Sequence, residues 1–105
     1  MEKTLNMPRF TFKSKERAKD FLTDIRKMIY LYDVITANDV LILGGNSPSN
    51  TGVDGFHYGY AKKDIRKVSP VKISKAEWIV ELPAPNRMIR GSYGHWTTEE
   101  PEEGE

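Results

Sequence analysis

The sequence predicts one α+β domain in which a long amphipathic helix and a short helix pack on a small, mainly antiparallel sheet. Two patterns and the chain length support this prediction. Apolar residues recur at steps of three and four through residues 15–33, as in a helix that buries one face. Apolar and polar residues alternate at 9–13 and 71–82, as in half-buried strands. A chain of 105 residues suffices for one domain with a modest core.

The first expected elements are a short strand and the long helix. In "RFTFK", Phe10 and Phe12 would share one face of the strand. Ser14 is a suitable N-cap, because a serine side chain can accept a hydrogen bond from the first helical turn. The helix is expected to run to about Asp33, with an apolar stripe made of Ala18, Phe21, Leu22, Ile25, Met28, Ile29 and Tyr32.

A shorter helix is predicted within "VITANDVLILGG", where a turn leads into it. Thr36 would be its N-cap, with Asp39 in the first turn. Gly44 would end it, since glycine tolerates the left-handed conformation found at helix ends. Residues 44–55 have the composition of a polar loop.

Strands are predicted on either side of a basic segment. "FHYGY" alternates, which would place Phe56, Tyr58 and Tyr60 on one face of a strand. "AKKDIRKV" is expected to form a helical turn. Residues 71–82 predict a hairpin with its turn near Lys75. Its second strand would direct Trp78, Val80 and Leu82 inward and Glu77, Ile79 and Glu81 outward.

These patterns define the expected core and boundaries. Residues 1–8 are expected to be a flexible N-terminus, 9–85 the domain, and 86–105 a tail that is acidic and disordered from about 97. The expected core consists of Phe21, Leu22, Ile25, Met28, Ile29, Leu41, Leu43, Tyr60, Ile65, Val71, Ile73, Trp78, Val80 and Leu82.

The residue types present give little support to catalysis or metal binding. There is no cysteine, so disulfides and thiolate ligands are excluded. The two histidines, His57 and His95, are far apart in sequence, and no serine stands in a nucleophile-elbow motif. We therefore expect no enzyme activity, no cofactor and no metal. No apolar run approaches the roughly 20 residues that span a bilayer, so we expect no membrane partner.

The charge distribution indicates a surface for an anionic partner. The net charge is +1, but the final "EEPEEGE" holds five of the fifteen acidic residues, which leaves a basic body. Basic side chains can neutralise phosphates, and Tyr58 or Tyr60 could stack on bases. The alternative is that the tyrosines are core and the lysines are solvated surface. The candidate nucleic-acid-binding residues are Lys62, Lys63, Arg66, Lys67, Lys72 and Lys75.

A protein interface is the other candidate site. Tyr58, Tyr93 and Trp96 are its expected residues, because large amphipathic rings are enriched where proteins meet. Trp78 is instead expected in the core. The long and the short helix followed by a hairpin also suggest a winged-helix arrangement, with "VKISKAEW" as the wing.

The order of these elements resembles a family of small phage and prophage proteins of unknown function. The resemblance is carried by "FLTDIRKMIYLYDVITANDVLILGG", "YGYAKKDI" and "WIVELPAP", over roughly two-thirds of the chain. It implies a viral or prophage origin and no catalytic residues.

The expected function is therefore non-catalytic binding to a protein partner, which could be a host factor, a virion component or a second copy of the chain. Nucleic-acid binding through residues 62–75 is the alternative. The expected location is the cytoplasm of a bacterial host, or the virion.

Overall fold

The computed structural model describes residues 7–46 and 54–99, and they form an α+β fold with antiparallel sheets. The helical elements are α1 (Lys15–Tyr32), α2 (Ala37–Leu43), α3 (Asp54–His57) and the 3₁₀ turn η2 (Lys62–Asp64). The strands are β1 (Phe10–Phe12), β2 (Val34–Thr36), β3 (Tyr58–Ala61), β4 (Val71–Ser74), β5 (Glu77–Val80), β6 (Asn86–Arg90) and β7 (Trp96–Thr98).

Helix α1 confirms the strongest sequence prediction. The Ser14 hydroxyl accepts a hydrogen bond from the Arg17 N–H at 3.2 Å, and this bond caps the N-terminus of the helix. The helix ends at Asp33, whose φ of 72° is left-handed and whose N–H donates to the Ile29 carbonyl at 2.7 Å. The expected stripe faces the core, except that Met28 is half-buried and Tyr32 is exposed.

The segment before α2 is a strand rather than the expected turn. Residues 34–36 form β2, and Thr36 then caps α2 by accepting a hydrogen bond from the Asp39 N–H at 3.1 Å. The left-handed residue after α2 is Gly45, with a φ of 83°, and not Gly44. The expected polar loop lies outside the described residues at 47–53.

The aromatic segment is divided between two elements. Phe56 belongs to the helical turn α3 and is exposed, so it does not share a strand face with the tyrosines. Tyr58 and Tyr60 lie on β3, and of these two tyrosines Tyr60 is fully buried and Tyr58 is half-buried. Between them, a Cβ on Gly59 would overlap the Ile35 carbonyl oxygen. Gly59 therefore permits the close approach of β2 and β3.

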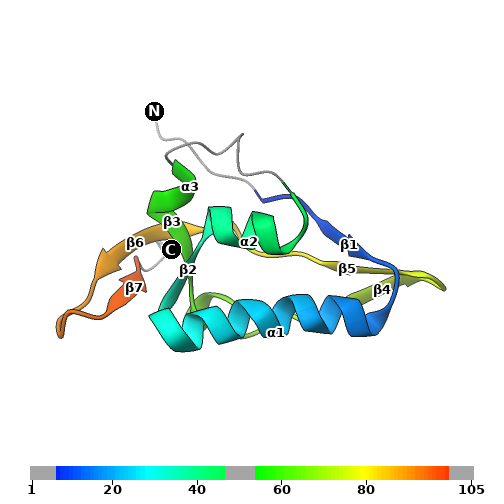
Figure 1. Ribbon diagram of the computed structural model, residues 1–105, viewed down its shortest axis with the longest axis horizontal. Helices are drawn as coiled ribbons and strands as arrows, with labels where there is room; N and C mark the ends of the chain where they lie inside the picture. The colour runs from blue at the N-terminus through cyan, green and yellow to red at the C-terminus, as the bar shows by residue number, and fades with distance from the viewer. Residues whose placement is uncertain (1–6, 47–53, 100–105) are drawn as a thin grey trace, which may run out of the picture.

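Two sheets replace the single sheet expected from the sequence. One has the strand order β1-β5-β4 and the other β2-β3-β6-β7, and every pairing is antiparallel. Figure 1 shows α1 along the long axis of the molecule. The β4–β5 hairpin extends beyond the start of α1, and the β6–β7 hairpin lies near its end (Figure 1).

The prediction that a tail begins at residue 86 is wrong. Asn86–Arg90 form β6 and Trp96–Thr98 form β7. Residues of β6 pair with β3, and Ile89 pairs with Thr97 across the hairpin. The strands were missed because "NRMIR" and "WTT" lack a clear apolar alternation. Of the expected flexible N-terminus, Met7 packs partly against the core, and residues 1–6 lie outside the described residues, as do 100–105.

Most of the expected core is confirmed. Leu43, Val71 and Ile73 are exceptions and are exposed; Val71 and Ile73 lie on β4, an edge strand whose four residues are all exposed. Ile79 is buried although it was expected to face outward; it lies on β5, the central strand of its sheet. Trp78, Met28 and Leu82 are partly buried against a cluster that also contains Phe10, Ala18, Ile35 and Val40.

Candidate functional site

The predicted basic cluster is divided between two regions of the molecule. Lys62 and Lys63 lie in η2, and Arg66 and Lys67 follow in the next turn. Lys72 lies on β4 and pairs with Trp78, and Lys75 occupies the hairpin turn. The Lys15 ammonium lies 5.5 Å from the centre of the Trp78 ring, so this hairpin packs beside the start of α1.

The other basic residues lie beside the second half of α1. Lys62 and Arg66 line a hollow with Arg26 and Asp33. From Lys15 to Arg26 the helix rises about 16 Å, at about 1.5 Å per residue. Lys62 and Arg66 therefore lie beside a different part of α1 from the hairpin residue Lys72.

The expected winged-helix arrangement is not formed by the described residues. The segment that would supply a recognition helix is the three-residue turn η2, preceded by the strand β3. The hairpin at 71–80 is present, but it pairs with β1 and closes a sheet. A short 3₁₀ turn cannot fill a major groove as a recognition helix does.

Lys63 and Asp64 bind the chain itself. Asp64 Oδ2 accepts hydrogen bonds from the Ala61 N–H at 2.8 Å and from the Thr98 hydroxyl. Asp64 Oδ1 accepts from the Asn86 amide at 3.1 Å, and the Lys63 Nζ donates to the Thr98 carbonyl at 2.8 Å. These contacts attach β6 and β7 to η2, which gives both charged residues a structural role.

Tyr60 is not part of a contact surface. It is 0% exposed, and its hydroxyl donates a hydrogen bond to the Pro83 carbonyl at 2.5 Å. Burial, and secondarily the negative charge of Asp64, raises the pKa of Tyr60 well above its usual value near 10. A base could not stack on this ring, so the predicted combination of Tyr60 with the basic segment is excluded.

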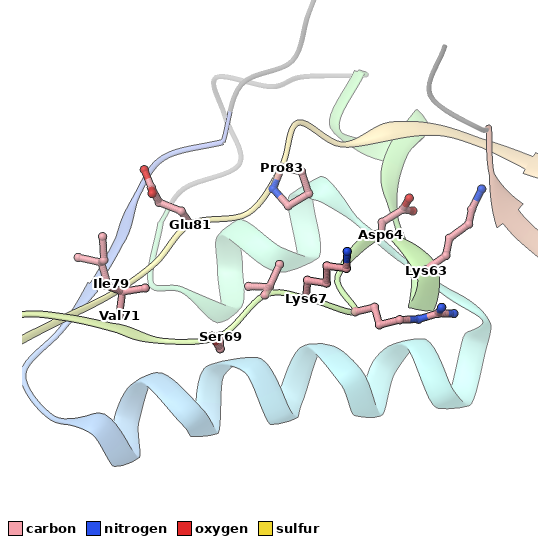
Figure 2. A pocket seen from close by; sticks show the side chains of 10 residues that line it. Lys63, Asp64, Lys67, Ser69, Val71, Ile79, Glu81 and Pro83 are labelled. Carbon is pink, nitrogen blue, oxygen red and sulfur yellow. The ribbon is translucent and has the colours of Figure 1, made fainter. Parts of the chain in front are cut away.

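A hollow of about 540 Å³ lies between η2 and the first sheet, and it has mixed charge. Figure 2 shows Lys63 and Asp64 on one side, Ile79 and Glu81 on the other, and Lys67 between them. Glu81 also forms an ion pair with Arg9, in which Glu81 Oε2 lies 3.1 Å from Arg9 Nη2. Two carboxylates in this hollow weaken its attraction for phosphates.

A second hollow of about 470 Å³ lies between α1 and the η2 segment, and we name it the α1 groove. Its helical wall has side chains at steps of three and four, which place them on one face. Its opposite wall is formed by residues that come directly after β3 in the sequence. The residues that line it are Arg26, Ile29, Tyr30 and Asp33 from α1, and Lys62, Ile65 and Arg66 from the other side.

The last turn of α1 is exposed around most of its circumference. Tyr30, Leu31 and Tyr32 are 87%, 65% and 60% exposed. Successive residues are about 100° apart around a helix, so three in a row cover about 200°. The adjacent Ile29 is buried, which shows that only one narrow side of this turn meets the core.

The β6–β7 hairpin brings two more exposed rings to this end of the molecule. Tyr93, in the turn, is 92% exposed, and Trp96, at the start of β7, is 43% exposed. The Arg90 guanidinium lies 5.1 Å from the centre of the Trp96 ring. His95 Nδ1 lies 3.2 Å from Asp33 Oδ2, so the hairpin turn adjoins the end of α1 (Figure 1).

We name this surface the aromatic end and define it by Tyr30, Leu31, Tyr32, Tyr93 and Trp96. Tyr93 and Trp96 were predicted from the sequence as interface residues, whereas residues 30–32 were not. The available signal was the run "YLY" at a helix end, because three consecutive large side chains cannot all face one core. Tyr58, the third expected interface residue, is half-buried on β3 opposite Arg87.

Within the described part of the chain, neither histidine lies in a metal-binding cluster. His57 is exposed at the end of α3, and His95 contacts Asp33. Across residues 7–46 and 54–99, no three His, Asp or Glu side chains are grouped to hold a metal ion. In the same ranges, no helix combines the length and the apolar character needed to cross a membrane.

No protein family model, no curated protein and no solved structure matches the chain.

Proposed function

We propose that this chain is a non-catalytic binding protein that attaches to a protein partner through the aromatic end. One observation carries the proposal: five large apolar side chains from two distant segments are exposed together where the Asp33–His95 contact joins the hairpin to α1. Large apolar side chains exposed at one end of a molecule are candidates for a binding surface, because large exposed apolar patches mark interaction sites.

The composition of the aromatic end favours a protein as the partner. Tyrosine and tryptophan supply large contact areas with few rotatable bonds, and they are enriched among residues that dominate interface energies. Arg90 over the Trp96 ring adds a guanidinium that can accompany the ring into an interface. The surface thus combines apolar area with groups that hydrogen bond at its margin.

The resemblance in sequence order supports a phage or prophage origin. On that basis the partner would be a host factor, a virion component or a second copy of this chain, in the host cytoplasm or in the virion. All three partners would meet the same exposed surface.

Site-specific crosslinking tests the proposal. Leu31 and Tyr93 are each replaced by the photo-crosslinking residue p-benzoylphenylalanine in protein expressed in bacteria, and adducts are identified by mass spectrometry. We expect a discrete protein adduct from both positions, because both side chains are exposed at the aromatic end. The control position is Thr23, exposed about two helical turns earlier. Equal adducts from Thr23, or none from Leu31 and Tyr93, would contradict the proposal.

Nucleic-acid binding through residues 62–67 is the second candidate. Lys62, Arg66 and Lys67 are exposed, and none of them forms an ion pair within the described part of the chain. A fluorescence titration with single-stranded and duplex DNA at low and high salt distinguishes the two functions. Micromolar binding that weakens steeply with salt, and that is lost in Arg66→Glu, would favour nucleic acid. The proposed function predicts no such binding.

A further inference from the structure

The α1 groove has an apolar base and a basic rim. Ile29 and Ile65 are buried and form the base. Arg26, Lys62 and Arg66 are exposed and line the rim. The groove volume of about 470 Å³ lies within the range of about 300–1,000 Å³ found for ligand clefts.

The rim can attract negative charge. One Arg26 Nη donates to the Val68 carbonyl at 3.0 Å, which fixes the guanidinium beside the groove and leaves its other N–H groups for a ligand. Asp33 is the acidic residue of the lining, and it contacts His95. The groove is therefore complementary to a ligand that has carboxylates next to an apolar group.

Tyr30 joins the groove to the aromatic end, because it lines the first and belongs to the second. A partner that covers Tyr30 at the aromatic end also reaches the edge of the groove. The two surfaces can thus form one interface with an apolar part and a basic part.

The surroundings favour a peptide over a nucleic acid as the occupant. A strand of nucleic acid needs successive cations along its backbone and aromatic faces for its bases. Here Asp64 and Glu81 interrupt the positive charge in the adjoining hollow beyond Arg66, so a long phosphate backbone would meet carboxylates there. The base of the groove is aliphatic, and Tyr30 is the aromatic ring among its lining residues.

We propose that the α1 groove receives an acidic segment of the protein partner, with a leucine- or phenylalanine-sized side chain over Ile29 and Ile65 and its carboxylates against Arg26, Lys62 and Arg66. This inference rests on the proposed function, since it specifies the chemistry of the partner that the aromatic end engages. The groove contact uses residues other than those of the aromatic end apart from Tyr30, so an experiment can refute it without refuting the proposed function.

Defined probes test the groove without the natural partner. The first is a short fluorescein-labelled peptide with a Leu-Phe pair flanked by glutamates. In the second the glutamates are glutamines, in the third Leu-Phe is Ser-Ser, and the fourth is an oligothymidylate of similar length. Binding is followed by fluorescence anisotropy, and amide shifts in ¹⁵N-labelled full-length protein locate the site. We expect the first peptide to bind about tenfold more tightly than the second or third.

Two charge reversals provide matched variants. Arg66→Glu should weaken binding of the first peptide by about tenfold, because it places a like charge on the rim. Lys72→Glu makes the same charge change on exposed β4, outside the groove, and should leave the affinity unchanged. Both positions are exposed, so both variants should fold.

Several results would overturn the inference. They are equal affinity for the first and second peptides, amide shifts away from Arg26, Tyr30 and Arg66, or tighter binding of the oligothymidylate at these residues. Loss of crosslinks from Leu31 and Tyr93 together with intact peptide binding would refute the aromatic end and leave the groove standing. Crosslinks from Leu31 and Tyr93 without any preference among the peptides would refute the groove and leave the aromatic end standing.

Discussion

Tyr60 and Tyr93 carry the same side chain and have opposite roles. Tyr60 is wholly buried with its hydroxyl on the Pro83 carbonyl, whereas Tyr93 is almost fully exposed at a hairpin turn. The sequence predicted the burial of Tyr60 from the alternation of "FHYGY". It could not predict the hydrogen bond, because Pro83 is distant in sequence and is brought near only by the pairing of the strands.

The raised pKa of Tyr60 predicts a loss of stability in alkali. Above pH 10 the hydroxyl ionises in the unfolded chain but stays protonated in the folded one, so the unfolded state binds fewer protons. The free energy of unfolding should therefore be unaffected by Tyr60 below pH 10 and fall above it by about 1.4 kcal/mol per pH unit. Urea unfolding between pH 9 and 11 measures this slope.

Tyr60→Phe is the matched variant for this prediction. It removes the titrating group and leaves the Pro83 carbonyl without its partner, at a cost of about 1–2 kcal/mol at neutral pH. Its alkaline slope should be shallower than that of the unchanged protein. The same slope in both proteins would assign the alkaline loss to other groups.

At the scale of elements, the sequence predicted those that depend on local hydrogen bonds and missed one that depends on contacts between distant segments. Helices α1 and α2 were predicted with their caps, because Ser14 and Thr36 bond residues three positions away. The β6–β7 hairpin was missed. It depends on the Asp64 carboxylate and the Lys63 ammonium, which lie in η2 and bind residues of β6 and β7. No sequence pattern encodes such contacts.

Asp64→Ala should therefore loosen the β6–β7 hairpin more than the rest of the fold. The change leaves the Thr98 hydroxyl, the Asn86 amide and the Ala61 N–H without their acceptor. We expect a loss of about 2–3 kcal/mol, with faster hydrogen exchange at β6 and β7 amides than at those of α1.

The control for Asp64 is another carboxylate on the surface. Glu81→Ala removes an exposed ion pair with Arg9, and we expect a change within about 0.5 kcal/mol. Unchanged exchange at β6 and β7 in Asp64→Ala would show that strand pairing alone holds the hairpin.

At the scale of the whole molecule, the fold places some residues that are near in sequence far apart, and it brings some residues that are distant in sequence together. Lys62 and Lys72 are near in sequence but lie beside opposite halves of α1. Arg26 and Arg66 are far apart in sequence and share one groove. The sequence thus identified several residue types that the candidate surfaces use, but their grouping depends on how β3, η2 and α1 pack together.

The acidic tail starts beside the basic segment. Thr98, whose carbonyl accepts from Lys63, is followed by Glu99, whose N–H donates to the Arg87 carbonyl at 2.9 Å. If the tail competes with nucleic acid, a variant ending at Thr98 should bind DNA or RNA roughly tenfold more tightly at low salt and equally at high salt.

Charge and length are separated by a second tail variant, in which each glutamate from Glu99 onward is glutamine. It should bind nucleic acid as tightly as the truncated protein. Equal binding by the intact and truncated proteins at low salt would show that the tail does not compete.

The pairing of β1 with β5 constrains when the molecule can be assembled. Phe10 pairs with Val80 and Phe12 with Trp78, so the first strand finds its place only after most of the chain exists. On the ribosome, α1 can form early from local contacts, while Phe10 must wait for β5 to emerge. Strand β1 is thus synthesised before β5 and docks only after it, and until then the part of the core that Phe10 fills stays open to other chains.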